Sequence, residues 1–215
     1  MRLIEPRLAE CRDTDESIAD LARRCRDAEL PVEELRFTGQ APGLELAKTE
    51  WRCCAFINCR FPGSALEKAY FADALFLNCD LSNLNLRHSF LRRTAFRDCK
   101  LTGADLTEST LEDVSVTGCV ARMINLAAGK LKRVRFDHSD LSRGCLSDCK
   151  LQAGIELDTC DLTQLECLQT PLKGVDLTTC TLDGLILAGP ELRGAVVTAL
   201  QASDLARYLG LVIRN

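Results

Sequence analysis

FINCRF, at residues 56–61, is the first of a series of related hexapeptides that recur along the chain. The later copies are FLNCDL at 76–81, FRDCKL at 96–101, VTGCVA at 116–121, FDHSDL at 136–141, LDTCDL at 157–162 and LTTCTL at 177–182. Successive copies are 20 residues apart, except for one interval of 21 residues between the fifth and the sixth. Self-similarity at a fixed period of this length is typical of a solenoid, in which each repeat packs on its neighbours.

Within each twenty-residue unit there is a five-residue rhythm of large apolar residues. This column runs in steps of five from Trp51 to Leu151 and, after one extra residue within 152–156, from Leu157 to Val197. A second column of mostly smaller residues lies two positions before each member of the first, and neither column contains a charge. Because 27% of the chain is charged, both columns are predicted to point into the core.

A period of five fits neither an α-helix, which repeats every 3.6 residues, nor a straight strand, which repeats every two. Inward residues two apart fit a short strand, so each pentapeptide is predicted to form one side and one corner of a coil. Matched residues recur after four pentapeptides, which predicts a four-sided coil. At the strand spacing of about 4.8 Å, seven and a half such coils would make a rod roughly 35 Å long.

The chain contains 13 cysteines and two histidines, without any CxxC pair. One cysteine column has members at the same place in successive coils: Cys59, Cys79, Cys99, Cys119, Cys160 and Cys180, with Ser139 completing the series. We interpret these thiols as buried small residues rather than as disulfides, redox groups or zinc ligands. No metal and no other cofactor is expected.

The segments GADLTEST at 103–110, FLNCDLSN at 76–83 and GVDLTTC at 174–180 resemble the pentapeptide-repeat family. The family pattern is a small residue, then often Asp or Asn, then Leu or Phe, then two outward residues. The resemblance covers about 150 of the 215 residues and implies an all-β fold, a right-handed quadrilateral parallel β-helix.

The tail LQASDLARYLGLVIRN, residues 200–215, resembles the end of the Qnr quinolone-resistance proteins. In those proteins and in the related MfpA type, the tail is a helix that joins two rods, which implies a homodimer. Thr198 and Gln201 have the spacing of a capping box, and Gly210 is placed to end the helix. The expected dimerisation residues are Leu205, Tyr208, Leu209, Leu211 and Ile213. The alternative is a helix that only plugs the last coil.

Three segments are expected: an N-terminal cap at 1–45, the β-helix at 46–197 and the C-terminal helix and tail at 198–215. Within the cap, Ile18, Leu21, Ala22 and Cys25 have helical spacing, which predicts an amphipathic helix over 15–29 that begins at an Asp or Thr cap. The helix is expected to cover the open end of the rod, with a partner-binding helix as the alternative. Without an apolar run of signal-peptide or membrane-spanning length, we expect a cytoplasmic protein that does not enter a membrane.

Charge is unevenly distributed along the predicted rod. Residues 152–192 contain seven acids and one base, Lys173, whereas the middle coils are rich in Arg and Lys. The register stacks Asp137 with Asp158 and Asp140 with Asp161, so these four are expected on one flat face. The candidate partner-binding residues are Asp137, Asp140, Asp158, Asp161, Asp176 and Asp183. The alternative is a solvated surface, and direct nucleic-acid binding by the basic coils is not expected because the pI is near 5.3.

No phosphate loop, nucleophile elbow or paired catalytic histidine is present, so we do not expect an enzyme. Two hypotheses remain. The resemblance implies a DNA mimic that binds a type II topoisomerase, DNA gyrase or topoisomerase IV, and alters quinolone susceptibility. The other hypothesis is a rigid scaffold for an unrelated protein partner. It is favoured by the unbroken register, because many Qnr proteins carry loops that project from the rod.

Overall fold

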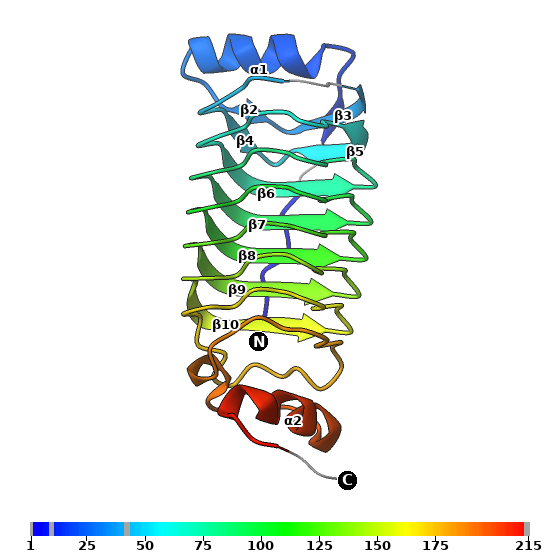
Figure 1. Cartoon of the computed structure of the whole chain (residues 1–215). Coiled ribbons are helices and arrows are strands. Elements are labelled where there is room, and N and C mark those ends of the chain that lie inside the picture. Colours follow the sequence, from blue (N-terminus) through cyan, green and yellow to red (C-terminus); the bar gives the residue numbers. More distant parts are fainter. Residues whose placement is uncertain (1, 9–10, 41–43, 213–215) are drawn as a thin grey trace.

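The computed structural model describes residues 2–8, 11–40 and 44–212. Figure 1 shows a rod of stacked parallel strands with helix α1 across one end and helix α2 at the other. The strands are β1 (Arg12–Asp13), β2 (Val32–Glu33), β3 (Leu35–Gln40), β4 (Glu50–Arg52), β5 (Ala55–Arg60), β6 (Tyr70–Leu77), β7 (Phe90–Arg97), β8 (Thr110–Thr117), β9 (Lys130–Asp137) and β10 (Lys150–Asp158). All of their pairings are parallel.

The predicted four sides are confirmed by four columns of paired residues. The two halves of strands β6 to β10 form two sides, because each strand bends where its fourth residue has a left-handed φ, as at Asp73 (55°). The third side pairs through single bridges such as Asp80 with Lys100, and the fourth through bridges such as Asn85 with Asp105. The chain is therefore a four-sided β-helix, as the recurrence of matched residues after four pentapeptides predicted.

Both predicted inward columns are buried. Every member of the first column from Trp51 to Leu146 is buried, and its partly exposed members are Leu151, Leu182, Leu192 and Val197. Phenylalanines stack within this column: the ring centroids of Phe56 and Phe76 are 4.6 Å apart, and those of Phe76 and Phe96 are 4.9 Å apart. Burial of these apolar side chains, worth roughly 1.5–3 kcal/mol each, stabilises the stack.

The cysteine column also links successive coils through hydrogen bonds. The Cys99 thiol donates to the Phe76 carbonyl at 3.4 Å, while its sulfur accepts the backbone N–H of Cys79 at 3.4 Å. Serine makes the same pair of bonds elsewhere: the Ser109 hydroxyl donates to the Leu86 carbonyl and accepts the N–H of Ser89. Small polar side chains at this inward position therefore connect neighbouring coils as well as filling space.

The extra residue predicted within 152–156 is confirmed as a β-bulge. The pairing of β10 with β9 shifts between Gln152 and Ile155, and Gly154 has a φ of 89°. Such a backbone conformation is readily adopted only by glycine. Leu151, beside the bulge, is only partly buried.

At the first end of the rod, the predicted helix is present as α1 (Ile18–Asp27), which buries Ile18, Leu21 and Ala22. The expected Asp or Thr cap is wrong: the N-cap is Ser17, whose side chain makes no capping bond. Strands β1, β2 and β3 precede residue 46 and already pair with one another and with later coils. The division of the chain at residues 46 and 198 stays a prediction.

At the other end, a short 3₁₀ turn, η1 (Pro190–Leu192), leads to α2 (Ala199–Leu205) and a second 3₁₀ turn, η2 (Ala206–Leu209). The capping box is confirmed: the Thr198 hydroxyl accepts the N–H of Gln201, and the Gln201 side chain accepts the N–H of Thr198. Gly210, with a φ of 71°, ends the helical segment as predicted. In the described part of the chain, no helix has the length and apolar character needed to span a membrane.

Candidate partner-binding surfaces

The four stacked aspartates flank one corner of the rod. Asp137 is paired in register with Asp158 at the ends of β9 and β10, and Asp140 is bridged to Asp161 on the following side. Between them the chain turns at His138, which has a φ of 46°. The expectation that all four lie on one flat face is therefore wrong. The left-handed residues His138 and Thr159, which follow Asp137 and Asp158, start a new side before Asp140 and Asp161.

Two of these carboxylates contact neighbouring side chains, and for Asp140 the neighbour is a cation. Arg122 donates from Nε to Asp140 Oδ2 at 2.5 Å, and the backbone N–H of Ser142 donates to Asp140 Oδ1 at 3.0 Å. Burial alone would raise the pKa of Asp140, but the bonds from Ser142 and Arg122 hold it below its ordinary value. Asp137 Oδ1 lies 2.6 Å from Nδ1 of His138.

Further along the rod, the aspartates are accompanied by threonines rather than by cations. Three of them accept hydrogen bonds in this way: Asp158 from Thr179, Asp161 from Thr163 and Asp176 from Thr178. Asp183 is exposed. Within the described residues, the salt bridge whose acid lies furthest along the chain joins Arg135 to Glu156, so these four aspartates keep their negative charge without a cation in salt-bridge range.

The basic middle coils carry a charge-paired column that the sequence analysis missed. At one corner, Asp73, Arg93, Asp113 and Arg133 follow one another at intervals of 20 residues and all have left-handed φ values. Arg93 donates two hydrogen bonds to Asp73, and Arg133 donates two to Asp113. The sequence does contain a signal for this column, because Asp and Arg alternate at intervals of 20 residues. We call these four residues the corner column.

The carboxylates of the corner column are buried although they occupy an outward position. Asp73 is 7% exposed and Asp113 is 2% exposed. The hydrogen bonds from Arg133 lower the pKa of Asp113 below its ordinary value, against the opposing effect of burial. For Asp73 burial is the largest influence, yet the bonds from Arg93 and from the N–H of Arg7 bring its pKa below the ordinary value as well.

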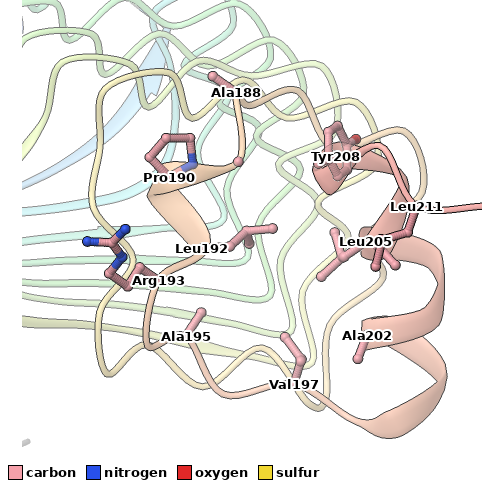
Figure 2. Close-up of a pocket in the computed structure, with 12 residues that line it drawn as sticks. Ala188, Pro190, Leu192, Arg193, Ala195, Val197, Ala202, Leu205, Tyr208 and Leu211 are labelled. Atoms are coloured by element: carbon pink, nitrogen blue, oxygen red, sulfur yellow. The ribbon is translucent and has the colours of Figure 1, made fainter.

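A groove of about 680 Å³ separates the last coil from the C-terminal tail. Figure 2 shows Leu192 and Val197 on the rod side of this groove and Leu205, Tyr208 and Leu211 on the tail side. Its lining is largely apolar. The tail therefore rests on the rod over a partly open apolar surface.

The predicted dimerisation residues differ in where they lie. Leu205 is 7% exposed, and the Tyr208 hydroxyl donates to the carbonyl of Leu185, so both hold the tail against the rod. Leu211 and Val212 are 58% and 86% exposed. The backbone of Leu209 belongs to η2, and Ile213 lies outside the described residues. Their role in pairing two copies stays a prediction.

The histidines and cysteines in the described part of the chain are not arranged as a metal site, and the cysteines form no disulfides. His88 Nδ1 lies 3.3 Å from Oε2 of Glu108, and the cysteines are free. Burial raises the pKa of Cys54 and of Cys167 to about 12, which leaves them as thiols at neutral pH. Among the described residues, no group of three or more His, Cys, Asp or Glu side chains is arranged to hold a metal ion.

The family described as pentapeptide repeat region matches residues 49–126. This stretch of the chain is therefore a pentapeptide repeat region, as the resemblance of its segments implied. No curated protein matches the sequence.

Three solved structures are similar to this chain, and two of them, HetL and Rfr23, are described as pentapeptide repeat proteins. HetL, involved in heterocyst differentiation regulation in the cyanobacterium Nostoc sp. strain PCC 7120, is 20% identical with a TM-score of 0.46 over 81% of this chain and 92% of its own. QnrB1, a plasmid-mediated fluoroquinolone resistance protein, is 20% identical with a TM-score of 0.45 over 85% of this chain and 99% of its own. Rfr23 from the cyanobacterium Cyanothece 51142 is 16% identical with a TM-score of 0.17 over 83% of this chain and 99% of its own.

Proposed function

We propose that this chain is a non-enzymatic binding protein whose acidic C-terminal coils occupy the DNA-binding surface of a type II topoisomerase. The observation that carries this proposal is that, among the described residues, no salt bridge involves an acid beyond Glu156. Beyond that residue, Asp158, Asp176 and Asp183 are exposed and lie outside any described salt bridge.

The stacking of two aspartate pairs, Asp137 with Asp158 and Asp140 with Asp161, supports DNA mimicry. Residues stacked on neighbouring coils are about 4.8 Å apart, whereas the phosphates of one DNA strand advance about 3.4 Å each along the helix axis. Stepped carboxylates of comparable density create a negative potential that attracts a basic groove. The resemblance of the tail at 200–215 to Qnr proteins directs the proposal to DNA gyrase and topoisomerase IV, and to an effect on quinolone susceptibility.

Pairing of two chains through their tails would strengthen this mimicry. The tail lies beside the acidic coils, so a dimer formed there would bring two acidic segments together near its centre. Exposed Leu211 and Val212 are the surface that supports such a homodimer.

The coils themselves favour the second candidate, a rigid scaffold for another protein. From 51 to 197 the described coils contain only tight corners and one bulge, without a projecting loop. A rod of this kind offers flat faces to a partner protein, and a scaffold does not need to mimic DNA.

The experiment that separates the two candidates is a DNA gyrase supercoiling assay with the purified protein titrated in, with and without ciprofloxacin. We expect the protein to inhibit supercoiling or to relieve the drug. The double variant Asp158→Lys/Asp161→Lys should then lose at least about tenfold in potency, because the new charges repel a basic groove.

A matched control places the same charge change at the opposite end of the rod. Asp20→Lys/Asp27→Lys alters two exposed acids on α1, and it should leave potency unchanged. Thermal unfolding of both variants checks that the coils remain folded. Equal loss in the two variants, or no effect of the wild-type protein well above the enzyme concentration, would leave the scaffold as the better account.

A further inference from the structure

The N-terminal residues 2–8, which we call the arm, lie along the rod instead of leaving it. Figure 1 shows the dark-blue N-terminal segment running across successive coils towards the level of β10. The backbone N–H of Arg7 donates to Asp73 Oδ1 at 2.9 Å, and that of Ile4 donates to Asp113 Oδ1 at 3.2 Å. The arm is therefore bound by the two carboxylates of the corner column.

The spacing of these bonds matches the repeat of the rod. Asp73 and Asp113 are two coils apart, a distance of about 9.6 Å at the strand spacing. Ile4 and Arg7 are three residues apart, which spans about 10 Å in an extended chain. An extended peptide parallel to the rod axis thus presents an N–H group to every second coil in register with the acids of the corner column.

The acids of the corner column are held in position by side chains of the rod itself. Each is fixed by two hydrogen bonds from an arginine of the next coil. The remaining acceptor positions of the carboxylates receive backbone N–H groups, which every residue except proline carries. Recognition by the corner column therefore depends mainly on an extended backbone.

One side chain of the arm adds charge complementarity. Glu5 lies between the two bonded N–H groups in sequence, and its carboxylate is 3.3 Å from Nη2 of Arg97 on β7. Both partners are exposed, with 59% of the Glu5 side chain and 51% of the Arg97 side chain accessible. The pair selects an acidic residue directly after the first bonded N–H while contributing little affinity.

The arm is held by few contacts. Ile4 is 44% exposed and Leu8 is 37% exposed, so the apolar side chains of the arm are far from fully buried. Among the described residues, two hydrogen bonds from backbone N–H groups to carboxylates and one exposed ion pair hold the arm, which gives it modest affinity. Attachment in the same chain compensates through a high effective concentration.

From these observations we propose that the corner column, together with Arg97, is a docking track for an extended peptide of a partner protein that carries one acidic residue, and that the arm occupies this track until the partner displaces it. The partner peptide needs backbone N–H groups at positions i and i+3 and an acidic residue at i+1. This track is separate from the acidic C-terminal coils, so the proposal does not depend on topoisomerase binding.

The test uses a full-length variant with a weakened arm, Ile4→Pro/Arg7→Pro. Proline lacks the backbone N–H, so this variant loses both bonds to the track while the track itself is unchanged. The matched control is Ile4→Ala/Arg7→Ala, which removes the same side chains and keeps both N–H groups. The probe is a synthetic, N-acetylated, fluorescently labelled peptide of residues 2–8, and binding is followed by fluorescence anisotropy.

We expect the peptide to bind the proline variant at least about tenfold more tightly than it binds the wild type or the alanine control, because their arms compete for the track. Asp113→Asn in the proline background should reduce this binding. A second peptide with proline at the positions of Ile4 and Arg7 should not bind, and this comparison remains valid even if Asp113→Asn impairs folding.

Three results would overturn the proposal. The peptide could fail to bind the proline variant at about millimolar concentration, the range of effective concentrations that a tethered arm experiences. The proline-containing peptide could bind equally well, which would show that the N–H groups are not recognised. Finally, the proline substitutions could lower the mass measured by light scattering. That result would assign the track to the arm of a second copy instead of a partner.

Discussion

At the scale of single residues, the inward position of each pentapeptide is occupied by side chains that are small and form hydrogen bonds between coils. Cys99 is 1% exposed, and its two inter-coil bonds involve backbone groups at the same repeat positions as those bonded by Ser109 on another side of the rod. We therefore expect Cys99→Ser to change the free energy of unfolding by less than about 1 kcal/mol. Cys99→Val should cost about 1–3 kcal/mol, because it adds volume to a packed interior and removes both bonds.

Urea unfolding of the two variants measures this difference. The comparison is informative because both substitutions remove the thiol. A larger loss for serine than for valine would mean that this column is held by apolar packing and that its hydrogen bonds contribute nothing.

A buried acid near the end of the rod gives stability a pH dependence. Glu191 is 7% exposed, and its carboxylate accepts the N–H groups of Gln169 at 3.0 Å and Ala188 at 3.1 Å. Burial alone would raise the pKa of Glu191, but backbone hydrogen bonds lower it below the ordinary value. A lowered pKa in the folded state contributes stability above the unfolded pKa of about 4.3, and this contribution is lost as pH falls through the folded pKa.

Glu191→Gln should accordingly reduce the free energy of unfolding by about 1–3 kcal/mol at pH 7, because it replaces charge-assisted hydrogen bonds with weaker neutral ones. The difference from wild type should shrink when urea unfolding is repeated near pH 3. Glu29→Gln, at an exposed position, serves as the control with the same chemical change. A loss that is equal at both pH values would contradict a charged Glu191.

At this scale, inward residues were predictable from sequence and the role of outward residues was not. The absence of charge in two columns identified the buried positions, because burying an unpaired charge is costly. Asp73 and Asp113 stand at outward positions, where the repeat tolerates any polar residue. Both accept hydrogen bonds from the arm, which carries no repeat signal and whose path the five-residue pattern therefore cannot predict.

At the scale of elements, the bulge in β10 interrupts an otherwise regular strand. Removing Gly154 would leave Leu151, Gln152, Ala153, Ile155 and Glu156 in the five-residue order of the preceding coils. Ala153, with a φ of 55°, would then stand where Arg133, at 53°, forms the corner one coil earlier. We expect deletion of Gly154 to leave the melting temperature unchanged or to raise it.

Deletion of Gly174, a corner residue with a φ of 77°, is the matched control. This deletion would shorten a coil that contains no extra residue, and it would turn the following apolar residues away from the core. We expect this variant to be strongly destabilised in thermal unfolding. A loss of similar size on deletion of Gly154 would show that the bulge is required for the last coils to form.

The C-terminal helix depends on a side chain that joins it to the rod. Besides completing the capping box, Gln201 donates from Nε2 to the carbonyls of Leu177 at 2.8 Å and Cys180 at 2.9 Å. Gln201→Glu keeps an acceptor for the Thr198 N–H but replaces both donated bonds with repulsion between a carboxylate and two carbonyls. Hydrogen exchange at residues 199–209 should become at least about tenfold faster, which corresponds to a loss of about 1.4 kcal/mol. Thr198→Ala, which removes the cap alone, should have a smaller effect.

Elements with a local signal were predicted well. The capping box, the ending at Gly210 and the helix over 15–29 each follow from residues close together in sequence. The expected flat acidic face failed because the corner at His138 was not counted between Asp137 and Asp140. Whether a side chain ends one side or begins the next depends on which residue takes the left-handed conformation, and in this rod residues of many polar types and a few small or apolar ones do so.

At the scale of the whole molecule, the rod has two different ends. One is covered by α1, which buries its apolar face against the first coils. The other is covered only in part, because the tail leaves the apolar groove and the exposed side chains of Leu211 and Val212. An uncovered apolar surface at one end of a solenoid favours association end to end.

We therefore expect the wild-type protein to have twice the mass of the 23.7 kDa chain in size-exclusion chromatography with light scattering. Leu211→Asp/Val212→Asp should give the mass of one chain, because two carboxylates would have to be buried for the tails to pair. The control is Val120→Asp/Met123→Asp, which changes two exposed apolar residues of a middle coil, 43% and 53% accessible. Aspartate occupies the position of Val120 one coil later, at Asp140, and the pentapeptide position of Met123 on another side of the rod, at Asp98. The control should therefore fold and keep the mass of the wild type. A wild-type protein with the mass of one chain would show that the tail only closes the last coil, and the acidic coils would then have to engage a partner from a single rod.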